Sequence, residues 1–409
     1  MANTVVTPSM IAKEALFQLK NNLIFSNQVY RQYEKEFTGG QGSTVSIRKP
    51  VKFVTSDGAT RVNQDVEEKT TSIVVDQRKH VSWNFSTQDL TLSIEEYSKR
   101  YIQPAVITLA QTMDAKGYDL YKAVWNAVGT PGTTPSNFAS VAATAQRLDE
   151  MAVPPASRSV VLNPAAAYAI AGNQTTLAAW DGKVKSAYEA ATLGPIANLM
   201  TYSSQNIKNH TVGTKAGTPL VNGAAQNVTY ANSTGNNTQT IITDGWTASS
   251  AVLKAGDIIT FANTFAVNPV PQETSKTVLP YLQQFVVIND VTADGTGNAT
   301  LTISPAIITS GPYQTVSAAP ADNAAITVLG TASTAYPQNM AFHTNAFALV
   351  TVPLEMPDGA AFKARENADG LSIRVIKDYD ISADVDIIRL DILYGWKAIY
   401  PDLAARLFG

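Results

Sequence analysis

The stretch FSTQDLTLSIEEYSKRYIQPA, residues 85–105, decides the fold that we expect, because it leads from a strand into a long helix. Ser93 and Glu96 have the spacing of a capping box, so the helix is predicted to begin near Ile94. Apolar residues then recur at helical spacing as far as Val128, which makes about 35 residues against the ~11–12 of an ordinary globular helix. No residue of this helix suggests chemistry, so we interpret it as a structural spine.

Two residues inside the predicted helix interrupt its regular geometry. Pro104 lacks the backbone N–H and its ring clashes with the preceding turn, so we expect a kink in the first third of the helix. Gly117 is a second weak point, because glycine costs up to about 1 kcal/mol relative to alanine in a helix interior. We therefore interpret Pro104 and Gly117 as positions at which the helix can bend.

The segment before the helix, residues 44–85, alternates apolar and polar side chains with the period of a β-strand. Its arms flank a polar stretch with the turn dipeptide Asp57-Gly58, which predicts a long two-stranded ribbon with a polar tip. An isolated ribbon is marginal in water, and the rest of the chain does not evidently supply a surface for it. We therefore expect it to lie on another copy of the chain. The candidate interface residues carry charges of both signs and are Arg48, Lys49, Arg61, Asp65, Glu67, Glu68, Arg78 and Lys79.

The segments around the ribbon and the long helix have mixed α and β character. Residues 1–43 form an N-terminal arm, whose helix is predicted to start at Thr7-Pro8 and whose glycine-rich end is a joint. Residues 86–212 hold the long helix and an ordinary α+β part. In that part we predict a helix from Thr134-Pro135, then a strand over residues 158–164 and a short helix capped by Asn163.

The last two segments consist mainly of strands. Residues 213–340 contain few charges and many Thr, Asn and Gly residues between short strands, which predicts an inserted all-β domain, a small barrel or sandwich. Residues 341–409 return to long alternating strands and close with a predicted short helix over residues 401–407. The fold class that we expect is therefore α+β.

Composition excludes several kinds of protein. The chain has 409 residues, with 30 Lys plus Arg against 33 Asp plus Glu and a formal charge of −3. Proteins that read nucleic-acid bases are usually basic, so this balance argues against that class, though not against loose contact with nucleic acid. There is no cysteine, so disulfides, thiolate metal sites and cysteine nucleophiles are excluded. The start lacks the pattern of a signal peptide and no apolar run reaches ~18 residues, so we expect neither secretion nor a membrane span.

Catalytic motifs are absent from the sequence. His80, His210 and His343 are scattered without metal-ligand spacing, and neither a phosphate-binding loop nor a nucleophile elbow is present. One strand carries the carboxylates Asp378, Asp380, Asp384 and Asp386, whose even spacing could hold a divalent cation or support acid–base chemistry. A solvated or partner-facing strand is the alternative that we favour. We therefore expect no enzyme, no cofactor and no metal.

Several long blocks also resemble one family. MANTVVTPSMIAKEALFQLKNNLIF, TVSIRKPVKF, FSTQDLTLSIEEYSKRYIQPA, VVLNPAAAYAIAG and GTPLVNGAAQ, with the later AGDIITFANTFAVNPV and LQQFVVIND, resemble the major coat protein of P22-like tailed bacteriophages. The resemblance implies an HK97-type coat fold. On that basis residues 1–43 are the N-arm, residues 44–85 the E-loop and residues 94–128 the spine helix of the peripheral domain. An axial domain follows, and residues 213–340 are an inserted six-stranded β-barrel.

The resemblance also implies a function and its partners. The expected protein self-associates as hexamers and pentamers into an icosahedral procapsid, with a scaffolding protein and a portal protein. The shell expands when it packages double-stranded DNA, which it contacts non-specifically, and it can carry a decoration protein. We expect it in the virion shell, assembled in the host bacterial cytoplasm, with no membrane partner. The alternatives are an encapsulin-like cellular nanocompartment and, less favoured, an enzyme that uses the aspartate strand.

Overall fold

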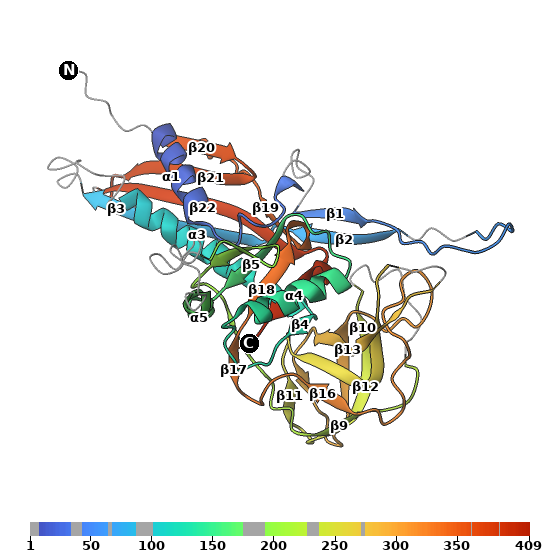
Figure 1. Ribbon diagram of the computed structural model, residues 1–409. Coiled ribbons are helices and arrows are strands. Elements are labelled where there is room, and N and C mark those ends of the chain that lie inside the picture. Colours follow the sequence, from blue (N-terminus) through green and yellow to red (C-terminus); the bar gives the residue numbers. More distant parts are fainter. Residues whose placement is uncertain are drawn as a thin grey trace. The chain divides into compact units, whose positions relative to one another are not determined.

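The computed structural model places the chain in two compact units, each built from separated stretches of sequence (Figure 1). Unit 1 comprises Met1–Ser46, Ser72–Tyr118 and Phe347–Lys397, and unit 2 comprises Ile47–Thr71, Asp119–Ala346 and Ala398–Gly409. The structure describes residues 8–33, 43–63, 68–86, 101–174, 193–226, 237–270, 275–360, 362–383 and 385–409.

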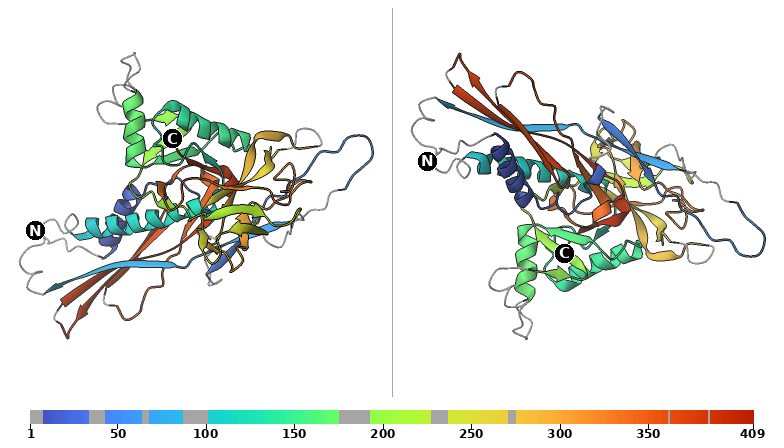
Figure 2. Two further views of the ribbon diagram at one scale, coloured as in Figure 1. Left: turned by 90° about the horizontal axis from the view of Figure 1, so that it is seen from below. Right: turned by 90° about the horizontal axis from the view of Figure 1, so that it is seen from above.

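Unit 1 is built on a five-stranded sheet covered by helices. α1 (Pro8–Asn22) packs against β20, β21 and the helix α3 (Gln103–Tyr118), and their buried side chains include Leu19, Val106 and Met113. β3 lies antiparallel beside β22 along most of its length (Figure 2). The strands of this sheet are β19 (Phe347–Thr351), β22 (Val385–Ala398), β21 (Leu371–Asp380) and β20 (Phe362–Ala368) in that order, with β3 (Gln77–Ser86) also paired to β22.

The long helix is shorter at its C-terminal end than the sequence predicts. α3 ends at Tyr118, a 3-10 segment η3 covers Asp119–Ala123, and β4 (Ala127–Val128) is a strand. The prediction of helix as far as Val128 is therefore wrong, because Ala127 and Val128 pair with a strand from the C-terminus of the chain. The predicted start, with its capping box, lies outside the described residues.

Pro104 stands at the second position of α3, after a short π-type turn at residues 101–102. In the first turn of an α-helix the missing N–H of proline leaves no hydrogen bond unmade, so the position is compatible with a regular helix. The residues that precede residue 101 lie outside the described part of the chain. The kink therefore stays a prediction.

Unit 2 contains a six-stranded mixed sheet with the helices α4 (Phe138–Glu150) and α5 (Pro164–Gln174). α4 begins three residues later than predicted from Thr134-Pro135, because Asn137 caps it by accepting the N–H of Ser140 at 2.9 Å. The strands run in the order β4, β23 (Ala404–Leu407), β18 (Asn339–His343), β5 (Arg158–Leu162), β7 (Leu199–Ser203) and β6 (Pro195–Ile196).

The C-terminal segment corrects a second prediction. Only Pro401–Leu403 forms a turn of 3-10 helix, η6, whereas Ala404–Leu407 is the buried strand β23 between β4 and β18. Proline favours the first turn of a helix, which explains the expectation of a helix over residues 401–407. Pairing with β18 on one side and β4 on the other makes the strand the observed structure.

A second six-stranded sheet of unit 2 is entirely antiparallel and nearly closes on itself. Leu220 in the end strand β9 forms an isolated bridge with Ala325, the residue before the other end strand, β16. Phe261, Phe285 and Leu301 fill its interior and are fully buried. The strands run in the order β16 (Ile326–Val328), β12 (Ile258–Val267), β13 (Val278–Val287), β15 (Ala299–Ser304), β10 (Gln239–Trp246) and β9 (Gly217–Val221). Two small sheets pair β11 (Ala251–Leu253) with β14 (Val291–Thr292), and β17 (Ala335–Pro337) with β8 (Asn209–Thr211).

The predicted ribbon forms, but it is shorter than expected. β1 (Thr44–Lys49) pairs with β2 (Lys69–Val74) as a two-stranded sheet. The following strand, β3, leaves the ribbon and joins the sheet of unit 1 instead of extending the second arm. The expectation of one ribbon over residues 44–85 is therefore wrong for residues 77–85, because β3 pairs along its length with β22 of the larger sheet.

Candidate functional site

The two-stranded ribbon presents charged side chains to solvent. Arg48 on β1 and Glu68 beside β2 form an ion pair of 3.4 Å, with side chains that are 78% and 55% exposed. Arg61 lies in the exposed connection between the two strands. Asp65 and Glu67 lie outside the described residues. An exposed ion pair adds little to the stability of one chain, so these charges remain available to a second surface.

The base of the ribbon rests on its own chain. The Lys49 ammonium lies 5.8 Å from the centre of the Tyr400 ring. The Lys52 N–H donates to the Tyr313 hydroxyl at 3.3 Å. The expectation that the chain supplies no surface for the ribbon is therefore wrong at this end, where unit 2 itself supplies one.

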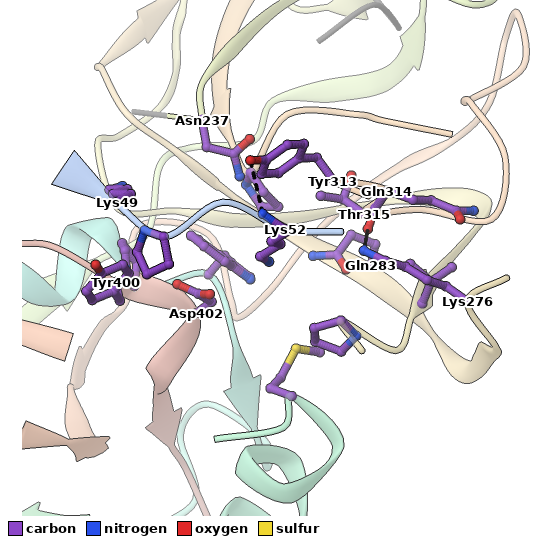
Figure 3. A pocket seen from close by; sticks show the side chains of 17 residues that line it. Lys49, Lys52, Asn237, Lys276, Gln283, Tyr313, Gln314, Thr315, Tyr400 and Asp402 are labelled. Atoms are coloured by element: carbon purple, nitrogen blue, oxygen red, sulfur yellow. Dashed lines mark hydrogen bonds between the residues drawn. The ribbon is translucent and has the colours of Figure 1, made fainter. Parts of the chain in front are cut away.

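A partly open cavity of about 220 Å³ lies beside this base (Figure 3). Its one described acidic side chain is Asp402, against the three lysines Lys49, Lys52 and Lys276. Lys276 is only 7% exposed, and its ammonium donates to the Gln314 carbonyl at 2.9 Å. Burial, with a smaller contribution from Lys52, lowers the pKa of Lys276 to about 8. The sequence gives no indication of this cavity, because its residues come from distant segments.

Arg78 and Lys79, the remaining ribbon candidates, lie on β3. Arg78 reaches the carboxylate of Asp391 at 4.0 Å. Asp391 is fully buried and accepts hydrogen bonds from Arg374 at 2.7 Å and Arg389 at 2.8 Å. Arg78 therefore neutralises a buried charge of its own chain, which distinguishes it from the exposed Arg48.

The described carboxylates of the aspartate strand, Asp378, Asp380 and Asp386, do not all lie on one face of the sheet. Asp378 and Asp380 lie on one face of β21, since alternate residues of a strand share a face. Asp386 is opposite Tyr379 in the antiparallel register, so it lies on the other face, where it forms an ion pair of 3.3 Å with Lys377. Asp384 lies outside the described residues. Within the described part of the chain, no group of three or more possible metal ligands occurs.

The histidines lie in separate places. His80 is exposed on β3, and His343 ends the buried strand β18. His210 contacts Asp257 at 2.7 Å and the Tyr121 hydroxyl at 3.1 Å.

The His210 cluster is packed as a structural element. Asp257 also accepts the N–H groups of Gly213 at 3.1 Å and Lys254 at 2.8 Å, so its carboxylate holds two loops together. The adjoining cavity measures only about 10 Å³, which leaves room for roughly one water molecule. Such an enclosed arrangement positions backbone and offers no space for a substrate.

One buried carboxylate in unit 1 was not evident from the sequence. Asp114 on α3 accepts the N–H groups of Ile24, Phe25 and Ser26 at 2.7, 3.1 and 3.0 Å, and so fixes the chain after α1. Burial raises the pKa of Asp114 above its ordinary value, although these hydrogen bonds act in the opposite direction. No local pattern reveals such a contact, because the donors lie far from Asp114 in the sequence.

Gly117, which the sequence marks as a position of bending, lies against aromatic rings. An added Cβ there would stand 2.7 Å from Trp396 and 2.8 Å from Phe25. The structure therefore gives this glycine a packing role, and its expected role as a bend stays a prediction.

The comparisons with known proteins agree on one group. The family described as "P22 coat protein - gene protein 5" matches residues 1–409. The chain is 26% identical over 290 residues to the "Major capsid protein" of Acyrthosiphon pisum secondary endosymbiont phage 1, which covers 69% of this chain and 68% of that protein.

Solved structures with a similar backbone are more distant. A structure from Mycobacterium phage Che8 has 15% identity and a TM-score of 0.47, with 94% of this chain and 90% of that chain covered. The capsid structure of the Cyanophage P-SCSP1u has 12% identity and a TM-score of 0.44, with 94% of this chain and 88% of that chain covered. No helix in the part of the chain that the structure describes is long and apolar enough to cross a membrane. Because the family match extends over the whole sequence, the chain belongs to the P22 coat protein family.

Proposed function

We propose that this capsid protein of the phage virion self-associates as hexamers and pentamers into an icosahedral procapsid. The observation that carries the proposal is the family match over residues 1–409. A coat protein needs surfaces for its own copies rather than a reaction centre. The exposed face of the ribbon meets that need, since it carries the solvent-exposed charges of Arg48 and Glu68, whereas Val45, Ile47 and Ile73 are buried within the same chain.

We further propose an HK97-type arrangement for the chain. The sheet of unit 1 with α1 and α3 would be the peripheral domain and N-arm, and the mixed sheet of unit 2 the axial domain. The nearly closed antiparallel sheet of β9 to β16 would be the inserted β-barrel. Its filled interior supports this role, because a core that includes Phe261, Phe285 and Leu301 helps an inserted domain to keep its shape.

The proposed partners follow from the family resemblance. A scaffolding protein would direct assembly around a portal protein, and the shell would expand when double-stranded DNA is packaged. DNA contact would be non-specific, which agrees with a formal charge of −3. A decoration protein is a further proposed partner. The encapsulin-like alternative is not favoured by the family match.

The ribbon is the proposed subunit-joining element. Each exposed ion pair is worth only about 0–1 kcal/mol, but a shell repeats the same contact at every equivalent interface. Arg48 and Arg61 are suitable test positions, because both are exposed. Arg78 is unsuitable, because its loss would also disturb the buried Asp391.

Velocity sedimentation of the purified protein, with and without its scaffolding protein, tests the proposal. We expect the wild type to convert from a slow species to particles of several megadaltons when the scaffolding protein is added. The variant Arg48→Glu with Arg61→Glu should keep the unfolding temperature of the wild type and form far fewer particles. A wild-type chain that stays monomeric at every concentration would contradict the capsid function itself.

A further inference from the structure

The cavity beside the ribbon base has an unusual charge for a recess of its size. Its walls include the aromatic side chains Trp125, Tyr313 and Tyr400, and among the described residues its charged side chains are three lysines and Asp402 (Figure 3). The whole chain has an excess of acidic residues, 33 against 30 basic ones, so this excess of positive charge is local.

Lys276 is the least satisfied of these groups. An ammonium can donate three hydrogen bonds, and within the described residues that of Lys276 makes one, to the Gln314 carbonyl. No carboxylate of the described residues forms an ion pair with it, although the side chain is almost fully buried. Burying a charge without a partner is costly, so burial lowers the pKa of Lys276. Repulsion from the neighbouring Lys52 charge lowers it further.

We propose that this cavity receives a carboxylate side chain from a second copy of the chain, which pairs with Lys276 and Lys52. This inference rests on the proposed self-assembly and names one contact within it. A carboxylate would accept hydrogen bonds from the remaining N–H groups of the Lys276 ammonium. Its negative charge would also offset the repulsion between the two lysines. The occupant comes from another copy because the rest of the chain carries the complementary excess of acidic residues.

The size and shape of the cavity favour a protein side chain over nucleic acid. A space of about 220 Å³ lies below the ~300–1,000 Å³ of ordinary ligand pockets but accommodates a single side chain. Lys276 lines this space and is almost fully buried, so a single carboxylate on a flexible side chain is a better fit for it than a bulky group. A backbone phosphate is held on a bulky sugar chain, which a space of this size does not accommodate.

Lys276→Met tests the pairing, because methionine keeps the length and apolar stem of the side chain without its charge. Lys254→Met is the matched control, since Lys254 is exposed in the same unit and does not line the cavity. We expect Lys276→Met to leave the monomer at least as stable as the wild type and to raise the concentration needed for shell assembly about tenfold. Unchanged assembly of Lys276→Met would overturn the proposal. Lys52→Met, at an exposed position, should show the same effect and serves if Lys276→Met does not fold.

A near-atomic cryo-electron microscopy map of the assembled shell decides the identity of the occupant. The expected result is an Asp or Glu side chain of a neighbouring copy within 4 Å of the Lys276 or Lys52 ammonium. A cavity that holds solvent, an ion, nucleic acid or a residue of the same copy would refute this inference and leave the capsid function intact. Failure to form any shell would instead refute the proposed function, and this inference with it.

Discussion

Gly117→Ala should destabilise the protein, although glycine-to-alanine changes inside helices usually stabilise. The new Cβ would lie 2.7 Å from Cζ2 of Trp396 and 2.8 Å from Cδ1 of Phe25, closer than the 3.0 Å that real Cβ contacts keep. These rings have little room to move. Phe25 is fully buried, and its ring centre is 5.5 Å from that of Trp396 and 4.7 Å from that of Tyr118.

The magnitude follows from two opposing effects. Overpacking a well-filled core costs about 1–3 kcal/mol, because side chains leave their preferred rotamers. Alanine recovers about 1 kcal/mol of helix propensity relative to glycine. The net expectation is a loss of about 1 kcal/mol in the free energy of unfolding, with a range of about 0–2 kcal/mol.

Urea denaturation of the unassembled protein, followed by tryptophan fluorescence, measures the difference. Gly172→Ala is the matched control, because Gly172 lies in α5 and an added Cβ there would meet no atom within 4 Å. It should stabilise by up to about 1 kcal/mol. If Gly117→Ala stabilises as much as Gly172→Ala, the packing argument is wrong and the glycine acts only on helix flexibility.

A second substitution identifies the ring responsible. Trp396→Phe removes the atoms closest to the new Cβ, and the indole N–H that it deletes is buried without a hydrogen-bond partner among the described residues. Gly117→Ala should therefore cost less in the Trp396→Phe background than in the wild type. A double-mutant cycle with no favourable coupling would exclude the Trp396 contact as the cause.

Three further predictions concern charged groups. Asp114→Asn should lower the free energy of unfolding by about 1–3 kcal/mol in urea denaturation, since an amide NH2 takes the place of one carboxylate oxygen and cannot accept the backbone N–H groups bound to it. Arg78→Glu should lower the free energy of unfolding by about 1–3 kcal/mol, because it adds a negative charge beside the buried Asp391. Arg48→Glu should lower it by less than about 1 kcal/mol, because its ion pair is exposed. Equal unfolding temperatures for the two variants would contradict this difference. The pKa of Lys276 falls from 10.5 to about 8 on folding, so between these pH values the unfolded chain binds more protons. The stability of the wild type should therefore rise relative to Lys276→Met as the pH increases through that window, and a difference that does not change with pH would exclude a desolvated ammonium.

The sequence predicts those helices and strands whose start, end and periodicity depend only on residues close together in the chain. Pro8 begins α1 as expected, and the buried strand β5 ends at Leu162 before Asn163, whose side chain accepts the N–H of Ala166 at 3.2 Å. The alternation of apolar and polar residues over β21 and β22 also predicts two long strands, because successive side chains of a strand point to opposite faces of the sheet.

Contacts between distant segments account for what the sequence does not predict. Ala127 and Ala404 both lie in segments with a plausible helical pattern, yet they belong to β4 and β23, whose pairing joins positions far apart in the chain. The candidate sites could not be predicted for the same reason, because their residues come from distant segments. The carboxylate of Asp391 meets Arg374 only once the register of β21 and β22 is set, and Lys276 meets Lys52 only once the ribbon base lies on unit 2.

The most direct test of the capsid function is cryo-electron microscopy of particles that the purified chain forms with its scaffolding protein. The prediction is a closed icosahedral shell whose wall consists of copies of this chain, with pentamers at the vertices and hexamers between them. Open sheets, amorphous aggregates or isolated monomers under conditions in which the chain remains folded would contradict it.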